Sequence, residues 1–85
     1  MTIGFDKDAL ADYQRWADTD RKVWKRINSL LRDIQRDPFD GIGKPEMLRA
    51  NLSGHRSRRI TDEHRLVYRV EGDTVVVIAC RFHYV

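Results

Sequence analysis

The sequence of 85 residues contains one cysteine and two prolines, and it has no long hydrophobic run. Cys80 cannot form an internal disulfide, so nothing indicates an oxidising compartment. No apolar stretch approaches the roughly 20 residues of a membrane-spanning helix. The amino terminus has neither the basic nor the apolar segment of a signal peptide. These absences predict a cytoplasmic protein that does not enter a membrane.

Motifs for bound cofactors are absent as well. The sequence has no Gly-rich phosphate-binding loop and no dinucleotide-binding fingerprint. Cys80 and His83 have the spacing of a metal-ligand pair, but a second pair is missing, so a zinc site is not expected. The sequence therefore predicts neither a cofactor nor a metal.

The residues that are present are sufficient for one small domain. The hydrophobic fraction is 41%, with three Phe, three Tyr and two Trp, which argues against disorder. A chain of this length has room for a single core, so residues 1–85 are predicted to form one domain. Because such a core gives little net stability, a partner or a second copy would add to it.

Apolar residues recur at helical spacing in the first half of the chain. A short strand over Thr2–Phe5 is followed by a helix that begins at an N-cap, Asp6, and extends to about Ala17. Its predicted apolar face contains Leu10, Tyr13, Trp16 and Ala17. Asp20 caps a second helix, which ends near Asp37 because Pro follows it. This helix has one apolar stripe, formed by Val23, Ile27, Leu30, Leu31 and Ile34.

The second half has the pattern of strands. Strands are expected at 57–61, 65–70 and 74–82, the last buried on both faces, with a hairpin turn at 71–73. A short extended piece is expected around 48–52. Helices followed by antiparallel strands predict an α+β fold, in which two N-terminal helices pack on a mostly antiparallel twisted sheet.

Positive charge is concentrated in one segment. The net charge of the chain is +3. Residues 44–65 contain six basic and three acidic residues, a difference of +3, so this segment alone matches the charge of the chain. The concentration favours a nucleic-acid partner. The basic residues are Lys44, Arg49, Arg56, Arg58, Arg59 and Arg65.

This segment and the C-terminus hold the groups that RNA cleavage without a metal requires. A base must take a proton from the 2′-hydroxyl, an acid must protonate the leaving 5′-oxygen, and cations must offset the charge on the phosphate. Glu46 is the candidate base, and because imidazole titrates near neutrality, His83 is the candidate acid. Arg59 and Arg65 can each bridge two phosphate oxygens. Tyr84 offers a phenol for hydrogen bonding or a ring for stacking on a base.

Each of these groups also has a purely structural interpretation. Glu46 would then be a solvated surface carboxylate, and His83 an ordinary residue near a chain end. Arg56, Arg58 and Arg59 would form the exposed face of an edge strand, where charge discourages aggregation.

The register of the predicted hairpin decides whether the candidates can meet. A three-residue loop at 71–73 places Arg65 opposite Ala79, and Arg65, Arg81 and His83 then point to one side of the sheet. A two-residue loop separates Arg65 from His83. The catalytic interpretation requires the first register, or a bulge that has the same effect.

Several runs of the sequence resemble toxins of the RelE/YoeB family. They are Lys44-Pro45-Glu46, Asn51-Leu52-Ser53-Gly54, the run from Ser57 to Tyr68 (SRRITDEHRLVY) and the run from Ala79 to Tyr84 (ACRFHY). The likeness continues upstream, for example at Asp12-Tyr13 and Lys25-Arg26-Ile27-Asn28, so it covers essentially the whole chain.

The resemblance implies a RelE-like fold and a toxin of a type II toxin–antitoxin system that cuts mRNA in the A site of the 70S ribosome without a metal. It implies that Glu46 is the general base, that His83 is the general acid, that Arg65 stabilises the transition state and that Tyr84 positions the substrate. It also implies homodimers and a YefM-like antitoxin with a disordered segment that wraps the toxin. The expected contacts to RNA and phosphate are Lys44, Arg49, Asn51, Arg58 and Arg59.

The sequence departs from the family pattern at a few positions. Arg49 stands where a Lys is usual, Met47 replaces a Pro, His55-Arg56 replaces an aromatic pair, and Val85 follows Tyr84. Two other functions stay open. One is a ParE-like toxin with another target, which needs no acid and base for a phosphodiester. The other is a non-catalytic module that binds RNA or the ribosome.

Overall fold

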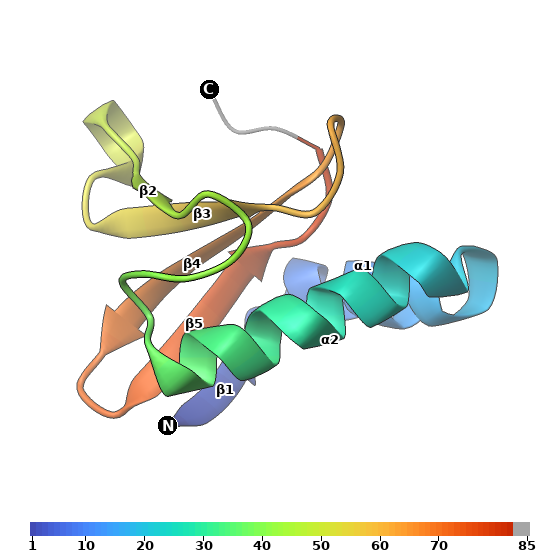
Figure 1. Cartoon of the computed structure of the whole chain (residues 1–85), viewed down its shortest axis with the longest axis horizontal. Helices are drawn as coiled ribbons and strands as arrows, with labels where there is room; N and C mark the ends of the chain where they lie inside the picture. The colour runs from blue at the N-terminus through green and yellow to red at the C-terminus, as the bar shows by residue number, and fades with distance from the viewer. Residues whose placement is uncertain (83–85) are drawn as a thin grey trace.

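Two helices lie on one face of a five-stranded sheet in the computed structural model, which describes residues 1–82 (Figure 1). The strand order is β1-β5-β4-β3-β2. β1 is parallel to β5, and all other neighbours are antiparallel. The predicted α+β architecture is confirmed. The strands are β1 (Thr2–Phe5), β2 (Glu46–Met47), β3 (His55–Arg59), β4 (Arg65–Glu71) and β5 (Thr74–Ala79).

Both helices begin at the predicted capping residues. The Asp6 carboxylate accepts hydrogen bonds from amides in the first turn of α1 (Lys7–Thr19), and Asp20 does the same for α2 (Arg21–Arg36). The predicted stripe of α2 is buried along its whole length. None of the helices in residues 1–82 is long and apolar enough to cross a membrane.

The apolar face of α1 is rotated relative to the prediction. Ala9 is buried and Tyr13 and Trp16 pack against the core, whereas Leu10 is 40% exposed. Ala9, Tyr13 and Trp16 follow one another at spacings of four and three, which puts them on one side of the helix. Leu10 lies about 100° away from Ala9 around the axis, so its assignment to the core was wrong.

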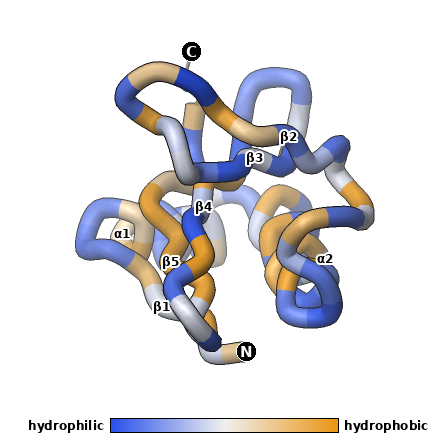
Figure 2. Tube along the Cα trace, turned by 90° about the vertical axis from the view of Figure 1, so that its left-hand side faces the viewer, coloured by the Kyte–Doolittle hydropathy of each residue, from blue (hydrophilic) through white to orange (hydrophobic). Residues whose placement is uncertain are grey.

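The core lies between the helices and one face of the sheet. The strand residues that contribute to it include Leu66, Tyr68, Val75 and Val77. Figure 2 shows hydrophobic residues along α2, β4 and β5 and a largely hydrophilic β3. Burial alternates along β5, which ends at Ala79. The prediction of a strand over 74–82 buried on both faces was therefore wrong, because helices cover only one face of the sheet.

Two segments of the second half differ from the prediction in their bounds. β3 begins two residues earlier than the expected strand at 57–61 and ends at Arg59, because the amides of Ile60 and Thr61 both donate to the carbonyl of His64 in a tight turn. The extended piece expected around 48–52 is a 3₁₀-helix, η1 (Ala50–Leu52), and the short β2 precedes it.

The hairpin of β4 and β5 contains a bulge. Its loop has two residues, since Glu71 pairs with Thr74, but the register shifts farther along, so that Val67 pairs with Ala79. The bulge restores between Val67 and Ala79 the parity that a three-residue loop would give. The predicted direction of His83 lies outside the described residues. The chain then turns at the end of β5, and Arg81 lies 4.0 Å from Asp12 of α1. The prediction that Arg81 points to the same side as Arg65 was therefore wrong.

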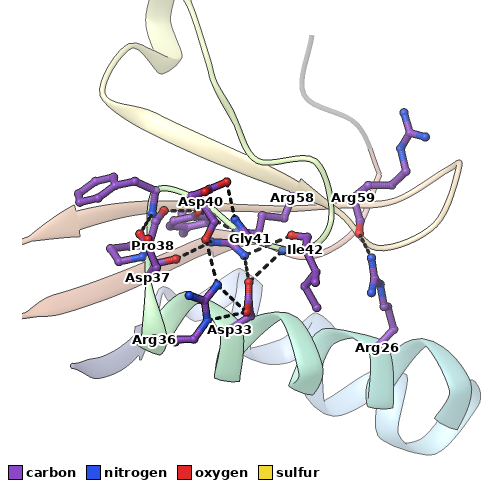
Figure 3. A network of polar contacts seen from close by, with 12 residues as sticks. Arg26, Asp33, Arg36, Asp37, Pro38, Asp40, Gly41, Ile42, Arg58 and Arg59 are labelled. Atoms are coloured by element: carbon purple, nitrogen blue, oxygen red, sulfur yellow. Dashed lines mark hydrogen bonds and ion pairs between the residues drawn. The ribbon is translucent and has the colours of Figure 1, made fainter.

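A buried arginine holds the loop of residues 37–45, which connects α2 to β2 (Figure 3). The side chain of Arg58 has no exposed surface, and its Nη1 lies 2.5 Å from a carboxylate oxygen of Asp33, which is 16% exposed. Its five N–H donors match five acceptors. Three of these are loop carbonyls, and the others are the Asp33 carboxylate and the Tyr68 hydroxyl. The carbonyls belong to Asp37, Asp40 and Ile42.

Two glycines allow the loop to approach this guanidinium. A Cβ on Gly41 would collide with the Asp33 carboxylate and lie 2.9 Å from Nη1 of Arg58, and a Cβ on Gly43 would lie 2.8 Å from the Leu30 side chain. Both residues have positive φ, at 143° and 82°. The carbonyl of Gly43 then accepts a 2.6 Å hydrogen bond from the amide of Arg59. The loop is thus fixed to β3 immediately before β2.

These contacts correct two interpretations of Arg58. It was expected to bind RNA or phosphate, but its side chain is fully buried and its donors are occupied within the protein. It was alternatively expected on the exposed face of an edge strand, but β3 lies between β2 and β4. Arg58 is a structural residue.

Tyr68→Phe should lower the free energy of unfolding by about 1–3 kcal/mol, because Nε of Arg58 and the carbonyl of Pro38 both lose a partner in a buried site. Urea denaturation measures this loss. Tyr13→Phe is the matched control, since it removes one hydrogen bond, to Asn28, at a half-buried site. An equal loss in the two variants would contradict the role of Tyr68 in holding the loop.

Candidate functional site

A carboxylate and a guanidinium meet on the face of the sheet opposite the helices. Glu46 in β2, Ser57 in β3 and Val67 in β4 occupy one row across the strands. Nη1 of Arg65 donates to Glu46 at 2.9 Å and to the hydroxyl of Ser57 at 3.2 Å. The side chain of Glu46 is 55% exposed and that of Arg65 is 15% exposed. Solvent, and hence a substrate, can reach the carboxylate, while Arg65 is held from two sides.

A second arginine lies next to this pair. Arg59 pairs directly with Arg65 in the register of β3 and β4, so both side chains point to the same face. The backbone carbonyl of Arg59 accepts a hydrogen bond from Arg26. The side chain of Arg59 points away from α2 (Figure 3). Like charges at opposed positions repel each other. A bound anion such as a phosphate would relieve that repulsion.

The other predicted RNA contacts surround β2. Lys44 precedes β2 with a positive φ of 51°. Arg49 occupies the N-cap position of η1, and Asn51 lies within it. All three residues are exposed. β2 and η1 lie on the side of β3 that faces away from the helices (Figure 1), so these side chains can extend the charged surface around Glu46.

His83 and Tyr84 lie outside the described residues, but the segment that leads to them is fixed beside Arg65. The amide of Arg65 donates to the carbonyl of Phe82 at 3.0 Å. The last described residue is thus bonded to the backbone of the residue that contacts Glu46. The residue that precedes the predicted acid in the sequence is thus bonded to the predicted cation.

Burial and hydrogen bonding shift the pKa of two groups outside this row. Hydrogen bonds from the Ile42 amide and from Arg58 hold the pKa of Asp33 below its usual value. Burial, with a smaller contribution from Asp12, raises the pKa of Cys80 to about 12. The raised pKa leaves the Cys80 thiol protonated at physiological pH, whereas a nucleophilic cysteine reacts as the thiolate. Residues 1–82 contain no cluster of His, Cys, Asp or Glu that could hold a metal ion.

The family model for the YoeB-like toxin of bacterial type II toxin–antitoxin systems matches residues 5–84. The chain belongs to this family.

Individual YoeB proteins are similar over their whole length. Toxin YoeB of Streptomyces coelicolor is 55% identical over 99% of this chain and 100% of its own. A YoeB/ParE toxin from Agrobacterium tumefaciens has 46% identity and a TM-score of 0.96, over 99% of this chain and 100% of its own. The toxins in a YoeB–YefM complex and in a YoeB dimer, both from Staphylococcus aureus, have 44% and 45% identity and TM-scores of 0.92, each over 99% of this chain and 98% of its own. The predicted resemblance is confirmed.

Sequence reasoning missed three residues that shape this YoeB-type site. Ser57 was read only as part of a motif, although it contacts Arg65 directly. Asp33 was given no role, although it binds Arg58. His64 was likewise read only as part of the run from Ser57 to Tyr68, although it accepts the Phe82 amide. The alternation of strand residues could have separated Ser57 and Arg59 from Arg58.

The stability contribution of Asp33 should depend on pH. Its pKa is lower in the folded chain than the ordinary 3.8, so the contribution is fully present above pH 3.8 and is lost as the pH falls through the folded-state pKa. Asp33→Asn should be less stable than the wild type at neutral pH, and the difference should shrink below pH 3.8. Urea denaturation of both proteins over a pH series measures it. A difference that does not change with pH would contradict the ion pair with Arg58.

Proposed function

We propose that the protein is a ribosome-dependent mRNA endonuclease, the toxin of a type II toxin–antitoxin pair, which cuts mRNA in the ribosomal A site and stops translation. The observation that supports this proposal most strongly is the contact of Glu46 with Arg65, beside Arg59, on an open face of the sheet. Membership of the YoeB family supports the toxin assignment. The reaction would take place in the cytoplasm, where ribosomes translate.

The proposed reaction needs no metal from the protein. Glu46 takes the proton of the 2′-hydroxyl, and the 2′-oxygen attacks the adjacent phosphorus. The bond from phosphorus to the 5′-oxygen breaks, and His83 gives its proton to that oxygen. The products are a 2′,3′-cyclic phosphate and a 5′-hydroxyl. Arg65 offsets the charge that develops on the phosphate, for which a guanidinium fork is suited.

The surrounding residues would position the RNA. Arg59 contacts the phosphate beside Arg65, and Tyr84 stacks on or bonds to a nucleotide next to the cut. The ribosome holds the mRNA bent for in-line attack, which supplies the orientation that this small surface cannot supply alone. Cleavage of free RNA should therefore be slow. The remaining contacts to phosphate are assigned to Lys44, Arg49 and Asn51.

The proposed protein partners follow from the family. A YefM-like antitoxin would bind the toxin through a disordered segment and block the site. This proposal is supported by the YoeB–YefM complex, and the proposal of homodimers by the YoeB dimer. A dimer would also add stability to a core of this size.

Primer extension on mRNA bound to programmed ribosomes tests the proposed activity. The wild type should produce new 5′ ends at the A-site codon, where the extended primer stops. Glu46→Ala and His83→Ala should each lower the rate by about 10²–10⁴-fold, the usual contribution of one acid or base. Arg65→Ala should lose cleavage and also bind more weakly.

The matched control is Glu71→Ala, which removes another exposed carboxylate paired with an arginine of β4, Arg69, at the far end of the strand. It should cut like the wild type. Full cleavage by Glu46→Ala and His83→Ala would remove the acid–base assignment. Intact mRNA with wild-type protein bound would favour a non-catalytic binding module. Intact mRNA on ribosomes that the wild-type protein does not bind would favour a ParE-like toxin with another target.

A further inference from the structure

His64 is a buried side chain that the proposed reaction does not use. It closes the turn between β3 and β4, where its amide donates to the Thr61 hydroxyl and its carbonyl accepts from Ile60 and Thr61. The residue is 9% exposed. Its ring lies 4.9 Å from the ring of Trp16 in a T-shaped contact and 5.5 Å from the ring of Phe82. The imidazole is thus fixed by its own backbone and by two aromatic neighbours.

The imidazole holds a strained residue at the end of the described chain. Phe82 has a φ of 60°, a left-handed conformation that aromatic residues rarely adopt. Its amide donates to Nδ1 of His64 at 2.8 Å, and its carbonyl accepts from the amide of Arg65 at 3.0 Å. A strained conformation of this kind persists only where the surroundings determine it. Here two consecutive residues bind both backbone groups of Phe82: His64, before β4, binds its amide, and Arg65, the first residue of β4, binds its carbonyl.

The hydrogen bond also defines the state of the imidazole. A nitrogen that accepts from a backbone amide does so through a lone pair, so Nδ1 of His64 carries no proton in this contact. Nε2 lies 3.5 Å from a carboxylate oxygen of Glu63. His64 therefore acts on Phe82 as an acceptor, which an apolar side chain of similar size cannot do.

A second hydrogen bond anchors the same segment two residues earlier. The indole nitrogen of Trp16 donates to the carbonyl of Cys80 at 2.9 Å. Because the indole also packs on the imidazole, Trp16 and His64 form one clamp on residues 80–82. The clamp holds the chain where it leaves β5 and fixes its direction before residue 83.

We propose that His64 is a positioning residue for cleavage: by accepting the Phe82 amide, it fixes the peptide that carries His83 beside Arg65. The proposal rests on the proposed function, in which His83 is the general acid. The carbonyl of Phe82, the last described residue before His83, accepts from the Arg65 amide. Loss of the bond to His64 leaves the Phe82 amide without this partner, so that only the carbonyl of Phe82 stays bonded to Arg65. A displacement of about 1 Å at a reacting group can cost about 100-fold in rate.

Two substitutions separate the acceptor from the packing. His64→Leu keeps an apolar side chain of similar branching and removes the acceptor, whereas His64→Asn places an amide oxygen close to the position of Nδ1. With ribosomes in excess, His64→Leu should lower the single-turnover cleavage rate by about 10- to 100-fold with little change in ribosome affinity. His64→Asn should recover most of that rate. In ¹⁵N spectra, the Phe82 amide should exchange faster in His64→Leu and stay protected in His64→Asn.

Ile34→Val is the matched control, because it weakens the core on α2 without touching this turn. It should cut at the wild-type rate at a temperature where its folded fraction equals that of His64→Leu. A rate for His64→Leu within about twofold of this control would overturn the proposal, and so would an equal loss in His64→Asn and His64→Leu.

The exchange measurement keeps this proposal separable from the proposed function. Unchanged protection of the Phe82 amide in His64→Leu overturns the positioning role whatever the cleavage result. A wild type that leaves ribosome-bound mRNA intact contradicts the endonuclease itself, and with it the role of His64 in cleavage. If the wild type cuts the mRNA and His64→Leu cuts it at the same rate, the positioning role alone is overturned.

Discussion

The hydrogen bonds of the Arg58 guanidinium determine how the second half of this molecule is arranged. A loop that packs against a core brings backbone carbonyls with it, and each of them needs a donor. Arg58 provides five donors in one plane and binds carbonyls of Asp37, Asp40 and Ile42. Asp33 balances its charge. A buried ion pair is often no more stabilising than an apolar pair of the same size, but breaking one is costly. Here the buried ion pair of Arg58 and Asp33 specifies one loop conformation, the one in which all the donors of Arg58 have acceptors.

That conformation brings the candidate site together. The loop ends at β2, so fixing its carbonyls places Glu46 opposite Ser57 and within reach of Arg65. The same strand, β3, therefore serves both faces of the sheet. Arg58 points into the protein and orders the loop, while Ser57 and Arg59 point to the open face. Arg58, a structural cation, and Arg59, a cation on the open face, are neighbours in sequence and have opposite surroundings.

The sequence predicted the features that depend on local pattern. The apolar stripe of α2 and the caps Asp6 and Asp20 follow from helical periodicity and side-chain hydrogen bonding over a few residues. A site that contains Glu46 and Arg65 was expected from the chemistry of the residues and from the family resemblance, but their direct contact was not predicted. No pattern of polar residues could show that Arg58 is buried, because its partners come from α2, from Tyr68 and from the loop of residues 37–45.

Other differences arise where tertiary contacts outweigh the local pattern. The run from Thr74 to Phe82 is apolar enough for a fully buried strand, but the helices cover only one face of β5 and the chain turns after Ala79. The bulge opposite Val67 depends on the pairing of two strands, which neither strand encodes alone. The left-handed Phe82 likewise depends on the acceptor of His64, which reaches it only in the folded chain.

The most direct test of the central role of Arg58 is amide hydrogen exchange in Arg58→Lys. The substitution keeps the charge and most of the length but removes the planar fork. The account predicts much faster exchange at the Ile42 amide, which bonds to Asp33, and at the Arg59 amide, which bonds to Gly43. Amides within α1 should exchange as in the wild type. Unchanged protection of Ile42 and Arg59 in a folded Arg58→Lys protein would contradict the account, since charge alone would then hold the loop.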